Sequence, residues 1–501
     1  MSPPFHTAAV VPAVLIGMLT TLLAGCELGP NFASPASPEI TGYTAPDEKN
    51  LPPEGAARGA KQRLAVGAKI EDEWWTIFRS PALDRVMKQA LADSPTIAQA
   101  QAQLVQAREQ VVATAGGLLP QADLAVSVGR QQFNAEPSGV SRTPVPVSLY
   151  SIGPTVNYAL DVFGGLKRQV EAKEAGVDLG EYQLGAAYLT LTGNVAIQAI
   201  TIASIRAEIK TVQRIIADDE KNVALVKTAL EGGTSTLVDL TAAQSQLAND
   251  RTLIPPLRQR LSVARHALTV YLGRSPAEWS PPDFDLADLI LPNVVPVSLP
   301  SELVRQRPDI LAAEAQLHIA SAGIGVATAN LYPQFTLTAD VIQGATNLGN
   351  FFSGVYTGYN ILGNMAAPIF HGGTLKAQQR IAYAVFDAAF ATYRQTVVQA
   401  FGQVADSLEA LLHDDEDVKA QAAAVASADK ALHLARLSFQ EGNSTLLQVL
   451  DAERQSDRAN IGLVQARSRR VLDTAQLFVA LGSGWWNTPP TRPAPATPPA
   501  G

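Results

Sequence analysis

The sequence is poor in the residues that build disulfides, aromatic cores and nucleic-acid surfaces. One of its 501 residues is cysteine, so no disulfide can form within the chain, and only 6% of residues are aromatic. The net charge of −8 argues against a nucleic-acid partner, which needs a basic patch. The six histidines lack metal-ligand spacing, and we find no phosphate loop and no nucleophile–base set. We therefore expect no enzyme activity, no cofactor and no metal site.

Charge is also absent from the start of the chain. Residues 1–25 contain no Asp, Glu, Lys or Arg, and their apolar run ends in Leu23-Ala-Gly-Cys26. Small residues before a cysteine predict a lipoprotein signal peptide and acylation (palmitate) of Cys26. Three acyl chains would anchor the protein firmly in a membrane, because a single chain binds only marginally. The alternative is a transmembrane anchor with a chance cysteine.

Proline is missing from two long stretches, Thr155–Ile254 and Ile369–Thr488, which predicts long helices. Residues 166–230 alone would span about 100 Å as one helix, which suits a tube of helices better than a globular domain. Apolar residues step by three and four as in a coiled coil. They are Val212, Ile216, Val223, Val226 and Leu230, and again Val397, Phe401, Val404, Leu408 and Leu411.

The uncharged stretch from Glu181 to Arg206 has the composition of a membrane-spanning helix. A lipid-facing helix should not carry a polar stripe at helical spacing, and this stretch carries one. The stripe consists of Thr190, Asn194, Gln198 and Thr201. We therefore favour a helix buried in protein.

The chain repeats itself. Residues 95–104 match 308–317, and Leu118-Leu-Pro-Gln121 matches Leu331-Tyr-Pro-Gln334 at the same offset. Each repeat reads as helix, two strands, long helix, turn and helix. The predicted segments are a signal peptide (1–25), a lipid-anchored tether (26–70), a first repeat (71–290), a second repeat (291–485) and a disordered Pro-rich tail (486–501).

Each repeat contains a pair of strands. Apolar residues alternate over 122–128 and 335–341, and charge-free return segments follow at 148–160 and 356–368. Strands of about ten residues with one apolar face suit a membrane β-barrel; the alternative is two solvent-exposed hairpins. Four strands cannot close a barrel and open edges do not stay in lipid, so several chains must pool their strands. Three chains would supply about 12 strands, enough to enclose a lumen.

Four segments resemble the outer-membrane factor family, the TolC-like, NodT-type efflux lipoproteins. They are Cys26-Glu-Leu-Gly-Pro-Asn-Phe32, Trp74-Trp-Thr-Ile-Phe78, Arg307-Pro-Asp-Ile-Leu-Ala-Ala-Glu314 and the region from Gly442 to Ala452. The four segments agree with the family in order and spacing, and the resemblance covers residues 26 to about 485. The resemblance implies an α+β membrane fold with two direct repeats. It also implies a homotrimer whose 12-stranded β-barrel in the outer membrane joins a periplasmic α-helical coiled-coil tube.

The function that the resemblance implies is the exit duct of a tripartite efflux system. Such a duct conducts substrates passively after docking to a periplasmic adaptor (membrane fusion protein) and an inner-membrane pump of the resistance-nodulation-division type. The alternative is a structural or adaptor-type periplasmic lipoprotein without a channel. An adaptor would carry lipoyl-like and barrel domains around one hairpin, and the direct repeat argues against it.

The turns between the long helices are the candidate functional sites. Gly232 and Gly442 are predicted to end helices in the left-handed conformation. Thr236 with Asp239, and Thr445 with Gln448, fit a helix capping box. The turn residues predicted to contact the adaptor are Gly232, Gly233, Thr234, Ser235, Gly442, Asn443 and Ser444.

In the family, carboxylates just past these turns line the pore constriction. Asp451 matches such a position, whereas Gln448 stands where the family has an acid, so a double acidic ring is in doubt. Asp239 is a candidate both for the pore and for the cap.

Three further features of the sequence are predicted to have structural roles. Trp74, Trp75 and Phe78 are predicted to be buried, and Arg307 with Asp309 to form a helix start at Pro308. The acidic run Asp414–Asp417 is predicted to be a solvated face, with a lumen-facing patch as the alternative.

Overall fold

The computed structural model describes residues 27–40, 42–43, 63–68, 70–71, 73–132, 146–352 and 357–483. The predicted signal peptide, Cys26 and the predicted tail lie outside these residues. Contacts divide the chain into two units. Unit 1 holds residues 1–35, 103–180 and 312–393, and unit 2 holds residues 36–102, 181–311 and 394–501.

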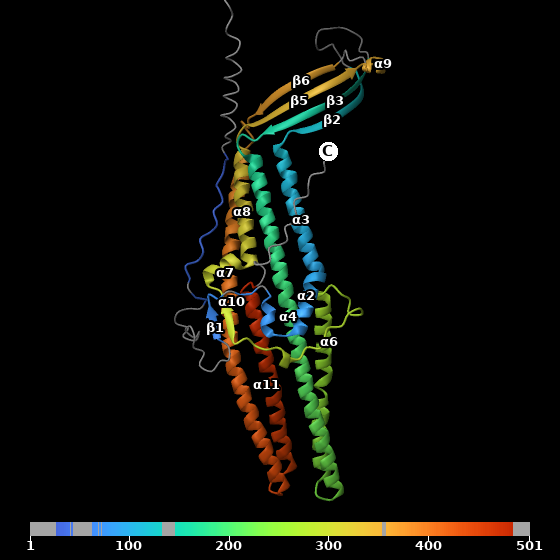
Figure 1. Ribbon diagram of the computed structural model, residues 1–501, viewed down its shortest axis with the longest axis vertical. Helices are drawn as coiled ribbons and strands as arrows, with labels where there is room; N and C mark the ends of the chain where they lie inside the picture. Colours follow the sequence, from blue (N-terminus) through green and yellow to red (C-terminus); the bar gives the residue numbers. More distant parts are fainter. Residues whose placement is uncertain are drawn as a thin grey trace, which may run out of the picture. The chain divides into compact units, whose positions relative to one another are not determined.

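Unit 1 contains one antiparallel sheet of four strands, seen in Figure 1, in the order β2-β3-β5-β6. The strands are β2 (Gln121–Gln131), β3 (Val147–Leu160), β5 (Gln334–Ala345) and β6 (Thr357–Ala366). The predicted strand pairs are confirmed to within a few residues. In the centre β3 of the first repeat pairs with β5 of the second, for example Val156 with Ala339.

The outer strands β2 and β6 are exposed along their whole length and have no partner on one edge among the described residues. One face of β2 carries Leu124, Val126 and Val128, each at least 66% exposed. Tyr359 and Ile361 do the same on β6. The alternation that predicted the strands therefore leaves apolar faces outside the chain's own core.

Four helices run through both units. They are α3 (Pro95–Ala115), α4 (Gly165–Glu231), α8 (Pro308–Ala329) and α10 (Thr374–Gln440). Both α4 and α10 have 67 residues, as expected for copies of one repeat without internal proline. Their predicted seams are largely buried: Val212, Val404 and Leu408 are at most 4% exposed. Short elements of unit 1 are η2 (Gly116–Leu118) and α9 (Leu348–Phe351).

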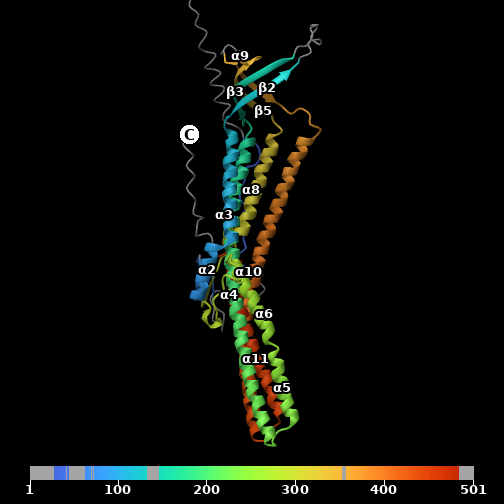
Figure 2. The same cartoon turned by 90° about the vertical axis from the view of Figure 1, so that its right-hand side faces the viewer.

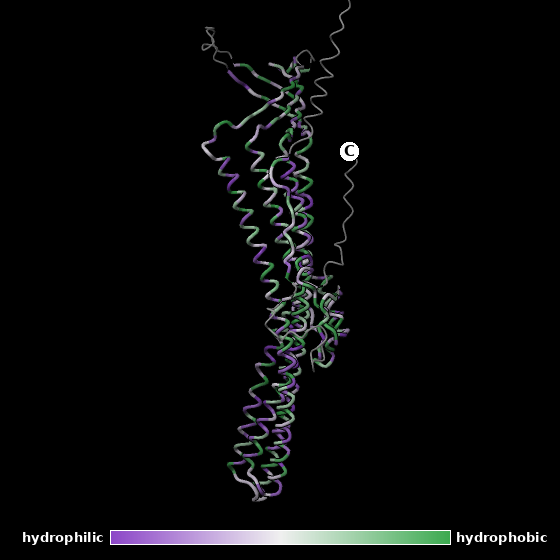
Figure 3. The backbone as a smooth tube through the Cα atoms, turned by 90° about the vertical axis from the view of Figure 1, so that its left-hand side faces the viewer, coloured by the Kyte–Doolittle hydropathy of each residue, from purple (hydrophilic) through white to green (hydrophobic). Residues whose placement is uncertain are grey.

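Unit 2 contains two helical hairpins. The first hairpin is the end of α4 with α5 (Leu237–Arg251), and the second is the end of α10 with α11 (Leu446–Ala480). Figure 2 shows α5 beside α11, and a shared apolar cluster joins them. Along these helices hydrophobic and hydrophilic residues alternate rather than form apolar blocks (Figure 3).

The first repeat ends in two helices rather than the single predicted one. A break at Thr252–Leu253 separates α5 from α6 (Ile254–Tyr271), whereas α11 is continuous over 35 residues. Pro255 and Pro256 follow the break. They lack the N–H groups that would continue α5, but they are tolerated in the first turn of α6.

The remaining elements of unit 2 surround the helices. They are β1 (Arg63–Val66), η1 (Trp74–Phe78), α2 (Pro81–Asp93), η4 (Leu286–Asp288), β4 (Val294–Val297) and α7 (Pro300–Gln306). Trp74, Trp75 and Phe78 are at most 4% exposed, and Trp74 stacks on Phe478 with ring centroids 5.7 Å apart. The predicted burial of these aromatic residues is confirmed. Pairing of β1 with β4 was not predicted, and it gives structure to the end of the predicted tether.

Arg307 directly precedes α8, which begins at Pro308 as predicted, and it also links three helices. Its guanidinium donates to Asp309 at 2.6 Å, to the Ala480 carbonyl at 2.6 Å and to Gln403 at 2.9 Å. The side chain is 5% exposed. The most specific motif in the sequence therefore holds the end of α11 against α10.

Among the residues that the structure describes, two helices, α4 and α8, are long and apolar enough to cross a membrane by length and composition. In α4, however, 56% of the apolar window is buried in the protein. Gly193 in this stretch lies so close to Val479 that a Cβ there would sit 2.8 Å from the valine side chain. Packing against protein therefore accounts for the uncharged stretch.

Candidate functional site

The first hairpin turns at two glycines. The left-handed residue is Gly233 (φ +73°), and the prediction that Gly232 would take this conformation is wrong. The N–H of Thr234 donates to the Ala229 carbonyl at 2.8 Å, and that of Gly233 to Leu230 at 3.0 Å. This is the Schellman motif, in which the residue after the cap must be left-handed. Both turns have five residues between their helices, 232–236 and 441–445, so Gly233 holds the place in the first turn that Gly442 holds in the second.

The predicted capping box at the start of α5 is confirmed. The N–H of Asp239 donates to the Thr236 hydroxyl at 3.2 Å, and the Asp239 carboxylate accepts from the Thr236 N–H at 3.0 Å. The Thr236 hydroxyl also donates to that carboxylate at 2.7 Å, and the bonds from Thr236 lower the pKa of Asp239. Asp239 is therefore ionised at neutral pH, with its charge committed to its own helix start.

The second hairpin turns by the same Schellman motif but lacks the capping box. Gly442 is left-handed (φ +76°) as predicted, and the Asn443 N–H donates to the Ser438 carbonyl at 2.9 Å. The predicted box at Thr445 and Gln448 is wrong. The Gln448 N–H donates to the Thr445 carbonyl at 3.1 Å, so the amide that the threonine hydroxyl should cap is already used.

Asp451 lies near the start of α11 and is accessible. Its side chain is 67% exposed and pairs only loosely with Arg454, at 3.3 Å. Gln448 is also exposed. Of the three residues predicted for the pore constriction, Asp451 thus carries the exposed carboxylate, whereas Asp239 is used by its cap.

Both tips expose apolar side chains that the sequence analysis did not single out. Leu237, Val238 and Leu447 are 68%, 76% and 61% exposed. Leu446, at the place that Leu237 holds in the first repeat, is 8% exposed and packs in the shared cluster. That cluster consists of Val226, Ala243, Leu446, Val449 and Leu450. The sequence contains a signal for this exposure. Two adjacent apolar residues follow each cap position, and only one of the two can face the core.

Carboxyl groups are buried between the helices above the tips. Asp219 is 3% exposed, and burial together with a hydrogen bond to Asp250 raises its pKa to about 8. Burial, with the nearby charge of Glu453, raises the pKa of Asp457 to about 7. Glu453 accepts from Asn222 at 2.6 Å and from Arg436 at 2.7 Å. These groups join α4, α5, α10 and α11.

The acidic run in α10 is solvated only in part, so the prediction of a solvated face is wrong for Asp414 and Asp415, whereas Glu416 is exposed. Asp414 and Asp415 are 8% and 7% exposed because they face α11. Arg470 pairs with Asp415 at 3.0 Å, and Arg469 pairs with Asp417. Burial and the neighbouring Asp473 raise the pKa of Asp414 to about 7.

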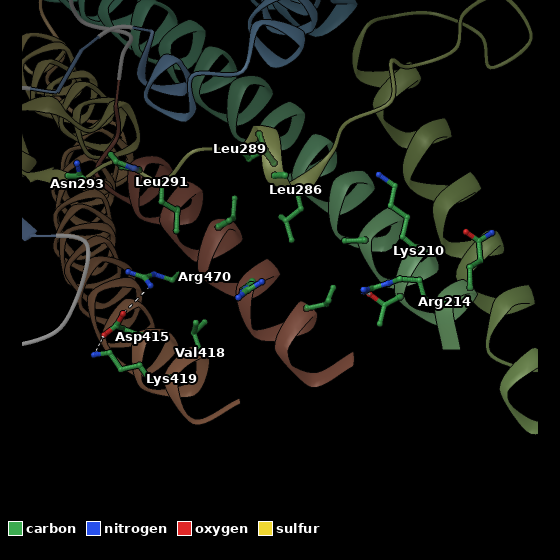
Figure 4. Close-up of a pocket in the computed structure, with 18 of the residues that line it drawn as sticks. Lys210, Arg214, Leu286, Leu289, Leu291, Asn293, Asp415, Val418, Lys419 and Arg470 are labelled. Atoms are coloured by element: carbon green, nitrogen blue, oxygen red, sulfur yellow. Dashed lines mark hydrogen bonds and ion pairs between the residues drawn. The ribbon is translucent and has the colours of Figure 1, made fainter. Parts of the chain in front are cut away.

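A cavity of about 1080 Å³ lies in unit 2 between α4, α11, α10 and the segment 286–293 (Figure 4). Its cationic lining is largely paired: Lys210 with Asp285 at 2.8 Å, and Arg470 with Asp415. The cavity is thus a gap between two hairpins of one chain.

The described part of the chain combines a four-stranded sheet, whose outer strands β2 and β6 expose apolar faces, with helices of 67 residues, and these features are typical of the subunits of membrane channels. Comparisons agree. The family model described as "Outer membrane efflux protein" matches residues 86–274 and 299–483. The chain belongs to this family.

Three similar proteins are informative. A pyoverdine export outer membrane protein, OpmQ of Pseudomonas aeruginosa, is 29% identical over 93% of this chain and 96% of its own. The cation efflux system protein CusC of Escherichia coli O6:H1 is 27% identical over 92% and 96%. The outer-membrane channel OprN has a TM-score of 0.82 at 24% identity, covering 92% of this chain and 100% of its own, so it supports the fold alone. The chain has a TolC-like fold and works as an outer-membrane efflux channel.

Proposed function

We propose that three copies of this chain form the exit duct of a tripartite efflux system. The observation that carries the proposal is the pair of open edges, β2 and β6, each with an apolar face. Unpaired strand edges do not persist in lipid, and membrane barrels need about eight strands or more. Three sheets of four supply about twelve strands, enough for an aqueous lumen.

The proposed conduit is passive and performs no chemistry. OpmQ is named for pyoverdine export and CusC for cation efflux, so similar chains serve unlike substrates. A duct that accepts whatever its pump delivers explains this breadth, and selectivity then belongs to the pump.

The proposed partners are a periplasmic adaptor and an inner-membrane pump of the resistance-nodulation-division type. The adaptor would meet the two turns at Gly232–Ser235 and Gly442–Ser444. Leu237, Val238 and Leu447 support this contact, because exposed apolar groups beside a turn favour a protein partner.

The proposal keeps the predicted organisation of the chain. Two repeats, 71–290 and 291–485, follow a cleaved signal peptide and a tether that Cys26 anchors to outer-membrane lipid. Acylation is tested by Cys26→Ser, which should abolish palmitate labelling.

Asp451 is the proposed acid of the pore constriction, with Gln448 beside it and Asp239 in a capping role. Symmetry would bring the copies of Asp451 together around the axis, and like carboxylates held close bind cations. Asp451→Asn should therefore weaken block by a trivalent cation in planar bilayers while assembly persists. Asp239→Asn is the matched control, and we expect its block to match the wild type. Unchanged block in Asp451→Asn would remove the gate assignment.

The assembly itself is tested by light scattering of the detergent-solubilised protein. We expect a protein mass about three times the 53.0 kDa of one chain, together with a conductance in bilayers. A monomer without conductance would contradict the proposal and favour the channel-free lipoprotein.

A further inference from the structure

The first described residues of the chain lie against the junction where β3 leaves the sheet and α4 begins. The Leu28 N–H donates to the Phe163 carbonyl at 3.4 Å, and Lys167 pairs with Glu27 at 3.8 Å. Gly164 is left-handed (φ +72°), and a Cβ there would lie 2.9 Å from the Glu27 Cα. The segment therefore sits directly on the turn.

A second glycine contact seats the segment against α8. A Cβ on Gly29 would lie 2.5 Å from the Gly325 Cα, closer than real Cβ atoms approach. A Cβ on Gly325 would lie 2.7 Å from Cγ of Arg168 and 2.9 Å from the Leu28 carbonyl oxygen. The two backbones thus touch in a notch that has no room for a side chain.

Arg168 of α4 closes the notch from the other side. It is 3% exposed, and its guanidinium donates to the Leu28 carbonyl at 3.1 Å and to the Asn31 side chain at 2.7 Å. A longer bond reaches the Gly29 carbonyl at 3.5 Å. A buried guanidinium requires partners for its donors, and the amino-terminal segment supplies three of them.

The charge of Arg168 is balanced within the same site. Glu171 accepts from Arg168 at 2.6 Å and contacts Nε2 of His318 at 3.0 Å. Phe32 stacks on the His318 ring, with centroids 4.4 Å apart and planes 11° from parallel. We call this site the amino-terminal clasp. It consists of residues 27–32 together with Gly164, Arg168, Glu171, His318 and Gly325.

We propose that the clasp is a positioning site for an acylated amino terminus, with Arg168 as the positioning residue. This inference rests on the proposed acylation of Cys26. Successive Cα atoms are about 3.8 Å apart, so the Cα of residue 26 lies about 3.8 Å from that of Glu27, the first residue of the clasp. The acyl chains then start beside the junction of β3 and α4. They enter the leaflet next to the sheet, because the clasp holds residues 27–32 against α4 and α8.

The position of the acyl chains can be measured by growing cells with a palmitate analogue that carries a diazirine. On illumination in membranes, we expect crosslinks within the chain to the peptide that contains the β3–α4 junction. Arg168→Gln should reduce these crosslinks at least fivefold per acylated chain. Lys173→Gln removes an exposed cation from the same helix and is the matched control, with crosslinks unchanged.

The same experiment separates this inference from the acylation on which it depends. Absence of the analogue from Cys26 would contradict acylation and the positioning site together. Incorporation with equal crosslinks in wild type and Arg168→Gln would overturn the positioning site alone. If Arg168→Gln fails to assemble, Asn31→Ala replaces it, because that variant removes one clasp bond and leaves the Arg168–Glu171 pair intact. Crosslinks in Asn31→Ala as frequent as in the wild type would then overturn it.

Discussion

The two hairpins of unit 2 come from one repeated design and differ where they turn. Both long helices have 67 residues and both turns use the same glycine motif. At the start of the next helix, Asp239 bonds its own cap, whereas Asp451 is 67% exposed. A carboxylate in a hairpin tip is therefore available to ions only when it accepts no hydrogen bond from a nearby backbone N–H.

The hairpins also differ in what they bury. Leu446 lies inside the cluster that all four helices share, whereas its counterpart Leu237 is 68% exposed. The α11 helix is unbroken, whereas a proline pair divides α5 from α6. At its tip the second hairpin thus buries Leu446 and exposes Leu447, whereas the first exposes both Leu237 and Val238.

The largest expected effect comes from moving the break of the first hairpin into the second. Val464 holds the place in α11 that Pro255 holds after α5. Val464→Pro should lower stability by about 3 kcal/mol or more, because proline removes a helical hydrogen bond and clashes with the preceding turn. The thermal midpoint of the helical circular dichroism signal measures it, with Val464→Ala as control. Equal midpoints for the two variants would show that continuity of α11 is dispensable.

Replacing the two corresponding leucines, Leu446 and Leu237, by alanine should distinguish a core position from a surface position by the loss of stability. Leu446→Ala is expected to cost about 2 kcal/mol, the low end for a buried leucine, because the site is close to a helix end. Leu237→Ala should change stability by less than about 0.5 kcal/mol, as at other exposed positions, yet weaken crosslinking to the adaptor. Equal losses of stability would erase the proposed distinction between the hairpins.

Each hairpin holds a buried carboxyl group whose proton is linked to folding. The pKa of Asp219 is about 8 and that of Asp414 about 7, above the roughly 3.9 of an unfolded Asp. A raised pKa means that the contribution to stability is complete below about pH 4 and is lost as the pH rises through the folded value. We expect a lower thermal midpoint at pH 9 than at pH 5. Asp219→Asn and Asp414→Asn should each flatten this dependence, and a pH profile that neither substitution changes would contradict the assignment.

The smallest effect concerns the capping difference. Asp239→Ala should lower stability by about 1 kcal/mol, because it removes the side chain that accepts from the Thr236 N–H in the capping box. In the second hairpin, Gln448→Asp should build a box at Thr445 and raise stability by a similar amount. Chemical denaturation of each variant measures both, and a Gln448→Asp variant without any gain would mean that Thr445 cannot rotate into a cap.

Much of the architecture was predictable because its signals are local and periodic. Alternation over residues 122–128 and 335–341 located the strands, and the absence of proline located α4 and α10. The capping box at Asp239 was predictable for the same reason, since its partner Thr236 is three residues away. The repeat then predicted the second half from the first.

What could not be predicted depends on contacts between distant residues. From the sequence, Asp414 and Asp415 are predicted to lie on a solvated face. In the folded chain, α11 places Arg469 and Arg470 against this part of α10. Parallel pairing of β1 with β4 joins segments more than two hundred residues apart. The missing cap at Thr445 shows the limit of the repeat itself, because the two turns share one glycine motif and yet only Thr236 with Asp239 forms a capping box.

The order of the sheet also restricts how copies can associate. Its two edges, β2 and β6, come from different repeats, so contact between chains joins unlike surfaces and is heterologous rather than two-fold. In the proposed trimer, β6 of one copy would meet β2 of the next in antiparallel sense, because each chain contributes an even number of antiparallel strands, and a rotation would close the ring. One copy with a blocked edge would then act as a terminator and leave the whole assembly open.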